Sequence, residues 1–166
     1  SLMKKYVVVP GMKLTWEDVL KNELRETIYQ LIKESPGIHL NEIMKTLEIG
    51  SHQALWHLGI LQEFNFLRKA KIGRKNAYFE IESDPSEDEF HFYLRNENVQ
   101  RILRLFKENI GSLSGKTQMS EELNMHYNTL TKYLKIMLEV GLIINDGKKT
   151  YQINPETHGR VLKVIN

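Results

Sequence analysis

The sequence predicts a mainly α fold with small β-hairpins, an α+β class, assembled from two copies of one unit. Residues 40–67 align with residues 116–143 without a gap, at an offset of 76 positions that pairs Leu47 with Leu123. Each copy has the pattern of a short helix, a turn, a longer helix and a β-hairpin, after an earlier amphipathic helix. Self-similarity at a fixed offset indicates a repeated structural unit. A chain of 166 residues with 41% hydrophobic residues can form two small cores.

The composition favours a soluble protein and excludes several kinds of site. The chain has no cysteine, which rules out disulfides, thiolate metal ligands and cysteine nucleophiles. No apolar run approaches the roughly 20 residues that cross a bilayer, and the short run at residues 6–9 lacks the features of a signal peptide. We therefore expect a cytoplasmic protein without a membrane partner. The net charge of +2 is only weak evidence for a polyanionic partner.

The first copy is expected to begin with a scaffold helix and a shorter second helix. Thr15 is placed to cap the scaffold helix, and Glu17 and Asp18 lie in its first turn. Apolar residues then recur at helical spacing until the Ser-Pro-Gly sequence at residues 35–37 ends the helix. Residues 40–47 have the apolar spacing of the second helix.

A tight turn and a third helix follow. In the Glu-Ile-Gly sequence at residues 48–50, we expect Gly50 to permit the sharp reversal of the chain. Ser51 can cap the third helix, which ends near Asn65, a residue that tolerates the left-handed conformation of a helix stop. The predicted buried face of this helix consists of Ala54, Leu58 and Leu61. Its position after the turn makes it the recognition-helix candidate.

The first copy ends in a hairpin that is rich in basic residues. Residues 66–72 and 77–82 are strand-like and are joined by residues 73–76, and in the second strand Ala77, Phe79 and Ile81 are expected to face the helices. Such a hairpin can lie along a phosphate backbone or enter a minor groove. Basic residues on a surface hairpin also serve solubility, so charge alone does not separate the two interpretations. The basic residues are Arg68, Lys69, Lys71, Arg74 and Lys75.

The second copy repeats the pattern with a shorter and less basic hairpin. Its three helices are expected over residues 99–110, 117–124 and 126–140. Its strands are expected at residues 142–145 and 148–153, with Asp-Gly between them as a two-residue type I′ turn. After Pro155, apolar residues at helical spacing predict a last short helix.

An acidic segment separates the two copies. Residues 83–91 contain Asp84, Glu87, Asp88 and Glu89 together with proline and serine, a composition typical of a solvated connector or an exposed loop. We therefore predict an N-terminal domain at residues 1–82, with an extension at 1–15, an acidic linker at 83–91 and a C-terminal domain at 92–166.

Three stretches of the first copy together resemble archaeal winged helix-turn-helix transcriptional regulators. These are Pro36-Gly37 before the second helix, the run ALWHLGIL at residues 54–61, and the run GRKNAYF at residues 73–79. The second copy is similar to the same superfamily through residues 133–135 and 139–143, although it lacks the basic hairpin tip. The resemblance implies two tandem winged helix-turn-helix domains in which the hairpin is the wing.

If the resemblance holds, the chain binds double-stranded DNA as a sequence-specific transcriptional regulator. The N-terminal positions of each recognition helix would face the major groove. Gln53 and Asn128 are suited to bidentate contacts with adenine, whereas packing on the protein is the simplest role for Trp56. These residues can equally be the polar face of a surface helix. The candidate contacts are Ser51, His52, Gln53 and Trp56 in the first copy, and Tyr127, Asn128, Thr129 and Lys132 in the second.

Enzymatic and metal-dependent functions find little support. The sequence has no glycine-rich phosphate loop and no i, i+4 histidine pair on one helix, so we expect no catalytic residue, no cofactor and no metal site. No separate domain for a small-molecule effector is evident. We expect His57 to lie on the helix surface or to be semi-buried, and to hydrogen bond with the backbone.

Two further expectations concern partners. Tandem winged helices also serve as protein-interaction modules in transcription or membrane-remodelling complexes, and this alternative remains open. Helix-turn-helix regulators usually bind two half-sites, so we expect a homodimer. The candidate seams are the strand-like residues 6–9 and the apolar C-terminal tail.

Overall fold

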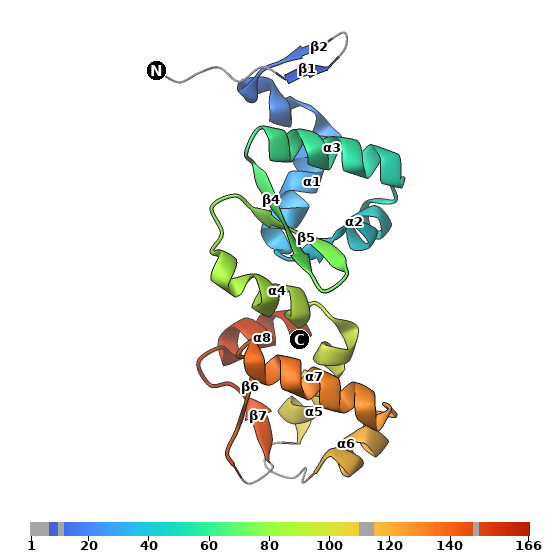
Figure 1. Cartoon of the computed structure of the whole chain (residues 1–166), viewed down its shortest axis with the longest axis vertical. Coiled ribbons are helices and arrows are strands. Elements are labelled where there is room, and N and C mark those ends of the chain that lie inside the picture. The colour runs from blue at the N-terminus through green and yellow to red at the C-terminus, as the bar shows by residue number, and fades with distance from the viewer. Residues whose placement is uncertain (1–6, 10–11, 110–114, 148–149) are drawn as a thin grey trace. The chain divides into compact units, whose positions relative to one another are not determined.

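A computed structural model of the chain describes residues 7–9, 12–109, 115–147 and 150–166 (Figure 1). The chain divides into two compact units, Ser1–Asp88 and Glu89–Asn166. Helices predominate, and the sheets of the described residues are small and antiparallel. The predicted mainly α class with small hairpins is therefore confirmed. In the described part of the chain, no helix is both long enough and apolar enough to span a membrane.

The first unit contains a helix-turn-helix and a three-stranded sheet. The core cluster between them includes Ile28, Ile43, Leu58 and Leu61, each fully buried. In chain order the elements are β1 (Val7–Val9), β2 (Met12–Leu14), the 3-10 helix η1 (Trp16–Lys21), α1 (Glu23–Glu34), β3 (Ile38–His39), α2 (Leu40–Leu47), α3 (Ser51–Glu63), β4 (Leu67–Ile72) and β5 (Lys75–Glu80).

The scaffold helix begins later than the sequence predicts. Thr15 makes no cap hydrogen bond to the backbone, and its hydroxyl group donates to the Asp18 carboxylate instead. The chain forms the short helix η1 and then an extended residue, Asn22, whose side-chain oxygen accepts a hydrogen bond from the Arg25 backbone N–H at 3.0 Å. Asparagine is among the best N-cap residues, and α1 therefore begins after Asn22.

The reversal between α2 and α3 uses Glu48 rather than the predicted Gly50. Glu48 adopts the left-handed conformation, with φ 53°, whereas Gly50 has φ −74° and caps α3 in an extended conformation. The prediction for Asn65 is confirmed, because its φ is 58° immediately after α3. Ser51, predicted as the cap, is the first residue of the helix.

The sheet has the order β3-β5-β4, and β4 pairs with β5 from Leu67↔Glu80 to Ile72↔Lys75. The predicted alternation of buried and exposed residues in the second strand is wrong at Tyr78, which is 2% exposed like its buried neighbour Phe79. It is also wrong at Ile81, which follows β5 and is 39% exposed. β5 is the central strand, and both of its faces are covered. Tyr78 packs in the core cluster, and the Arg68 guanidinium lies 4.7 Å from the Phe79 ring centroid on the other face.

The acidic segment has regular structure. Residues 85–87 form a 3-10 helix capped by Asp84, which accepts a hydrogen bond from the Ser86 N–H at 2.9 Å, and α4 begins at Asp88. Phe90 belongs to the buried cluster of the second unit. The expected irregular connector is therefore replaced by helical turns, because the acidic residues cap them and apolar residues among them are buried.

The second unit repeats the helix-turn-helix at the predicted offset. Its left-handed residues, Asn124 with φ 44° and Gly141 with φ 78°, lie 76 positions after Glu48 and Asn65. Its elements are α4 (Asp88–Leu94), α5 (Glu97–Glu108), α6 (Lys116–Glu122), α7 (Tyr127–Glu139), β6 (Ile143–Asn145), β7 (Tyr151–Ile153) and α8 (His158–Ile165).

Two predictions about the ends of the units are revised. The register Asn145↔Tyr151 leaves residues 146–150 between the paired strands, so the connection is longer than the predicted two-residue turn; residues 148–149 lie outside the described residues. The predicted C-terminal helix is confirmed as α8, whose residues Val161 and Ile165 are buried in the second unit. The N-terminal strand, proposed as a dimer seam, pairs with β2 of the same chain, while Tyr6 lies outside the described residues.

Candidate nucleic-acid interface

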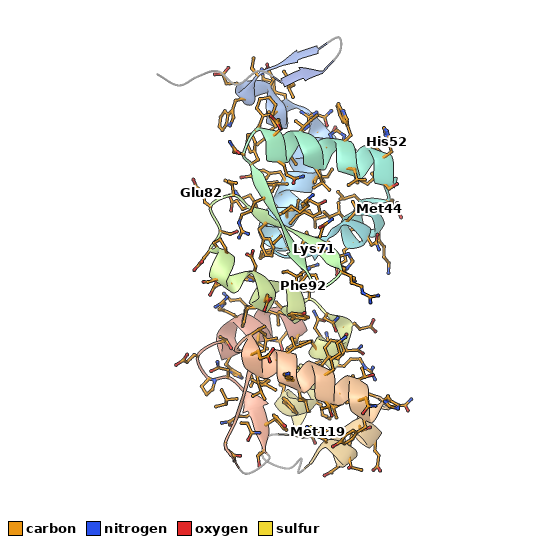
Figure 2. The ribbon with its side chains drawn as sticks, viewed as in Figure 1. Met44, His52, Lys71, Glu82, Phe92 and Met119 are labelled. Carbon is orange, nitrogen blue, oxygen red and sulfur yellow. The ribbon has the colours of Figure 1, made fainter. Side chains whose placement is uncertain are left out.

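The start of α3 presents the side chains that the sequence predicts for base contact. Ser51, His52 and Gln53 are all exposed, and His52 marks this end of the helix in Figure 2. The buried residues Ala54 and Leu58 hold the opposite side of the helix against the unit. The geometry therefore leaves the N-terminal turn of α3 accessible to a ligand, as the helix-turn-helix interpretation requires.

Trp56 covers a buried arginine on α1. The Arg25 guanidinium lies 5.3 Å from the Trp56 ring centroid, and Arg25 is only 3% exposed. Arg25 donates a hydrogen bond to the Val19 carbonyl at 2.8 Å, and burial lowers its pKa. Trp56 itself is 42% exposed, so it combines a packing role with an accessible ring edge.

His57 lies beside this pair and is buried rather than near the surface. It is 4% exposed, and its Nδ1 has no hydrogen-bond partner within the described part of the chain. The predicted hydrogen bond to the backbone is therefore not made at Nδ1. Burial lowers the pKa of His57, and the neighbouring Arg25 charge lowers it further. The histidine is thus held in its neutral form.

The β4–β5 hairpin carries an exposed basic cluster, which we call wing 1. Its tip is Gly73-Arg74, where Gly73 has φ 59° and Ile72 pairs with Lys75. The Lys75 Nζ lies 3.1 Å from the Nε2 of His39 on β3. Figure 2 marks Lys71 on this hairpin. The exposed members of wing 1 are Lys69, Lys71, Arg74 and Lys75.

Arg68 is withdrawn from wing 1 by contacts within the first unit. Its two terminal nitrogens donate to the Asp88 carboxylate at 2.6 and 2.7 Å, and it also donates to the carbonyl and hydroxyl oxygens of Ser83. The hydrogen bonds that Arg68 donates to Asp88 are the main cause of its raised pKa. Because its two terminal nitrogens already have protein acceptors and its Nε is buried, we remove Arg68 from the candidate interface. The sequence shows the charge of this arginine but not its long-range partner.

The start of α7 presents a polar and basic face. His126 is the N-cap, and its Nδ1 accepts a hydrogen bond from the Asn128 backbone N–H at 3.2 Å. Tyr127, Asn128 and Lys132 are exposed, whereas Thr129 is half-buried. Lys135, one turn beyond Lys132, is also exposed and lies 4.0 Å from Glu139. Sequence reasoning missed Lys135, although its i+3 spacing from Lys132 places both on one side of the helix.

The described residues include no group of three or more histidine or acidic side chains placed to hold a metal ion. Wing 1 and the start of α7 present cations and polar groups instead. Cationic and amide side chains of this kind bind phosphate oxygens and base edges.

Comparisons with known proteins divide the chain as the structure does. Residues 22–90 match a family model described as an N-terminal HTH domain, and residues 95–159 match one described as winged helix-turn-helix. An uncharacterized HTH-type transcriptional regulator of Methanocaldococcus jannaschii is 31% identical over 127 residues, which cover 76% of this chain and 32% of the relative. The chain thus spans about a third of the length of that relative.

Proposed function

Because this chain belongs to the winged helix-turn-helix proteins, with one such domain in each half, we propose that it is a transcriptional regulator that binds double-stranded DNA. The name of the matched relative supports the regulatory part of this proposal. The matched families indicate a regulator rather than an enzyme, so we assign no catalytic residue and no cofactor.

The exposed N-terminal face of α7 is the observation that carries this proposal. Asn128 has the paired donor and acceptor that match an adenine edge in the major groove, and Tyr127 and Lys132 flank it with phosphate-binding groups. The His126 cap orients the first turn, since its Nδ1 is occupied by the Asn128 N–H. Helix α7 is therefore the base-reading helix in our proposal.

Wing 1 supplies backbone contacts in this proposal. Its four exposed cations lie on a projecting hairpin, which suits a phosphate backbone or a minor groove. In α3 the accessible residues Ser51, His52, Gln53 and Trp56 include no lysine or arginine. We therefore assign the principal DNA contacts to α7, where an amide side chain and an exposed lysine lie together, although the repeated sequence predicts use of both helices.

The test is a binding measurement by fluorescence anisotropy on a mixed-sequence duplex across a salt series. We expect the full chain to bind at low salt, and we expect its affinity to fall steeply as salt rises because phosphate contacts release counterions. Lys132→Glu should weaken binding strongly, whereas Lys163→Glu on α8 removes the same charge away from the interface and should change it little. Absence of binding at low salt would contradict the proposal and favour a protein-interaction module.

A further inference from the structure

Helices α3 and α7 can be compared position by position. Both contain 13 residues, and Ser51–Glu63 corresponds to Tyr127–Glu139 at the offset of 76. Their buried sides agree, because Ala54, Leu58 and Leu61 correspond to buried apolar residues of α7. Those residues are Leu130, Leu134 and Met137. The two helices therefore dock on their units through the same three positions, and α3 also buries His57 and Ile60. We compare their outward faces on this basis.

The outward faces differ in chemistry at three matched positions. Leu55, Trp56 and Gly59 of α3 correspond to Thr131, Lys132 and Lys135 of α7. Leu55 is 49% exposed and Trp56 is 42% exposed. At these positions α7 has two exposed lysines and the half-buried Thr131, and it exposes Tyr127 and Leu138 elsewhere. In α3 the two exposed apolar side chains, Leu55 and Trp56, are neighbours. Exposed apolar groups that are contiguous mark a surface for a partner.

Gly59 adds an independent observation. It lies inside α3 and is exposed, and a Cβ added there would meet no atom within 4 Å. Packing within the unit therefore does not require a glycine, and glycine is a poorer helix former than alanine. The missing side chain does leave a shallow site beside Trp56 where an external group can approach the helix backbone closely.

We propose that this outward face binds the same face of a second copy of the chain, with the two α3 helices antiparallel around a two-fold axis. The face consists of His52, Leu55, Trp56, Gly59 and Glu63. With successive residues 100° apart, these five fall within an arc of about 100°. A two-fold axis between positions 57 and 58 places each Trp56 over the Gly59 of the other copy. Large and small groups thus complement one another, as a symmetric interface requires.

Charge supports a second copy as the occupant. Glu63 is the one residue among the Asp, Glu, Lys and Arg types in α3, so two copies of this face bring few like charges together. The same axis places each Glu63 near His52 and the N-terminus of the other α3, where the helix dipole favours a negative charge. A nucleic acid is a poor fit, because the face has no lysine or arginine to meet phosphates.

Sedimentation equilibrium of the full chain, without DNA and over a concentration series, tests this inference separately from DNA binding. The wild type should associate reversibly to twice the chain mass. The variant Leu55→Thr/Trp56→Lys/Gly59→Lys carries the residues that α7 has at these positions, so it should stay folded by circular dichroism and sediment as a monomer. A wild type that stays monomeric throughout, or a folded triple variant that dimerises like the wild type, would overturn the inference.

The control variant changes exposed apolar residues away from α3. Ile81 and Val164 are 39% and 40% exposed, so Ile81→Lys/Val164→Lys introduces two lysines outside the proposed interface. This variant should dimerise like the wild type. If it became monomeric, added charge rather than loss of the α3 face would explain the triple variant, and the inference would fail.

Gly59→Ala tests the packing of Trp56 over Gly59. Alanine favours the helix and meets open space within the chain, so the dilute monomer should melt at a higher temperature than the wild type. The added methyl group should nevertheless weaken association, by about tenfold, because it fills the site of the other copy's Trp56. Unchanged or tighter association would contradict this packing.

Discussion

Helices α3 and α7 occupy the same place in two copies of one fold unit but carry different side chains on their outward faces. The buried residues Leu130, Leu134 and Met137 of α7 match Ala54, Leu58 and Leu61 of α3, which also buries His57 and Ile60. Left-handed residues stand at matched places before and after both helices, at Glu48 and Asn124 and again at Asn65 and Gly141. The outward sides differ in character at matched positions such as Trp56 and Lys132. The positions that determine the fold are therefore separate from those that select a partner, and the second set is free to diverge within one chain.

The largest effect we predict comes from matched core positions, where the two units should behave alike. Leu58→Ala and Leu134→Ala each remove a side chain that is almost fully buried. Each should cost about 2–5 kcal/mol of unfolding free energy in its own unit, because a cavity remains after the transfer free energy is lost. Urea denaturation followed by circular dichroism measures both. A cost below about 1 kcal/mol for one of them would break the equivalence of the cores.

The ion pair of the first unit has no counterpart at the matched position of the second, where Arg68 corresponds to Ile144. Arg68→Ala leaves the buried Asp88 carboxylate without its main donor and should cost about 2 kcal/mol of stability. Urea denaturation measures this cost.

The folded Arg68→Ala variant should bind duplex DNA like the wild type, whereas Lys71→Ala should weaken binding without a change in stability. The reverse pattern would return Arg68 to the interface.

A pH dependence should distinguish the units at another matched position, where His57 corresponds to Tyr133. Burial lowers the pKa of His57 below its ordinary value of 6.5, so the unfolded chain binds a proton more readily than the folded chain. The resulting stability is present above pH 6.5 and is lost as pH falls from there towards the folded pKa. The contribution of His57 is obtained by comparing the unfolding free energies of the wild type and His57→Phe at a series of pH values from 6.5 downwards. If the unfolding free energies of the two proteins changed with pH in parallel, the predicted contribution of His57 would be contradicted.

The smallest effect concerns the left-handed turn residues. Glu48 adopts φ 53° with a side chain that disfavours it, so Glu48→Gly should stabilise the first unit by about 0.5–1 kcal/mol. Asn124→Gly should gain less in the second unit, because asparagine tolerates this conformation better. Thermal unfolding of both variants gives the comparison. A loss of stability in Glu48→Gly would mean that its side chain makes a contact that outweighs the backbone cost.

Sequence periodicity was sufficient for the fold because the repeated signal comes from buried residues. The positions of α2, α3, α6 and α7 follow from apolar spacing, and the structure confirms them to within one or two residues. The errors occurred where a contact outside the apolar pattern, such as a helix cap or a tertiary contact, determines the structure. Asn22 competes with Thr15 as a cap, and both faces of β5 are covered, so Tyr78 is buried against the expected alternation.

The candidate site was less predictable than the fold. Arg68 has the same charge as the other hairpin residues, and its engagement depends on Asp88, 20 positions later, within a segment predicted to be solvated. Trp56 stands in a mainly apolar run of the sequence, which does not reveal that it lies over Arg25 of another helix. Tertiary contacts therefore decide which basic or aromatic side chains are held within the protein and which stay accessible. A local sequence pattern does not contain these contacts.

The most direct measurement is sedimentation velocity with a labelled duplex on two variants, one for each matched helix. If α7 binds DNA and α3 binds a second copy, Lys132→Glu should sediment as a dimer with little duplex bound. Leu55→Thr/Trp56→Lys/Gly59→Lys should be a monomer that still binds duplex. Dimerisation by the α3 variant together with undiminished duplex binding by the α7 variant would contradict the assignment of separate partners to the two helices.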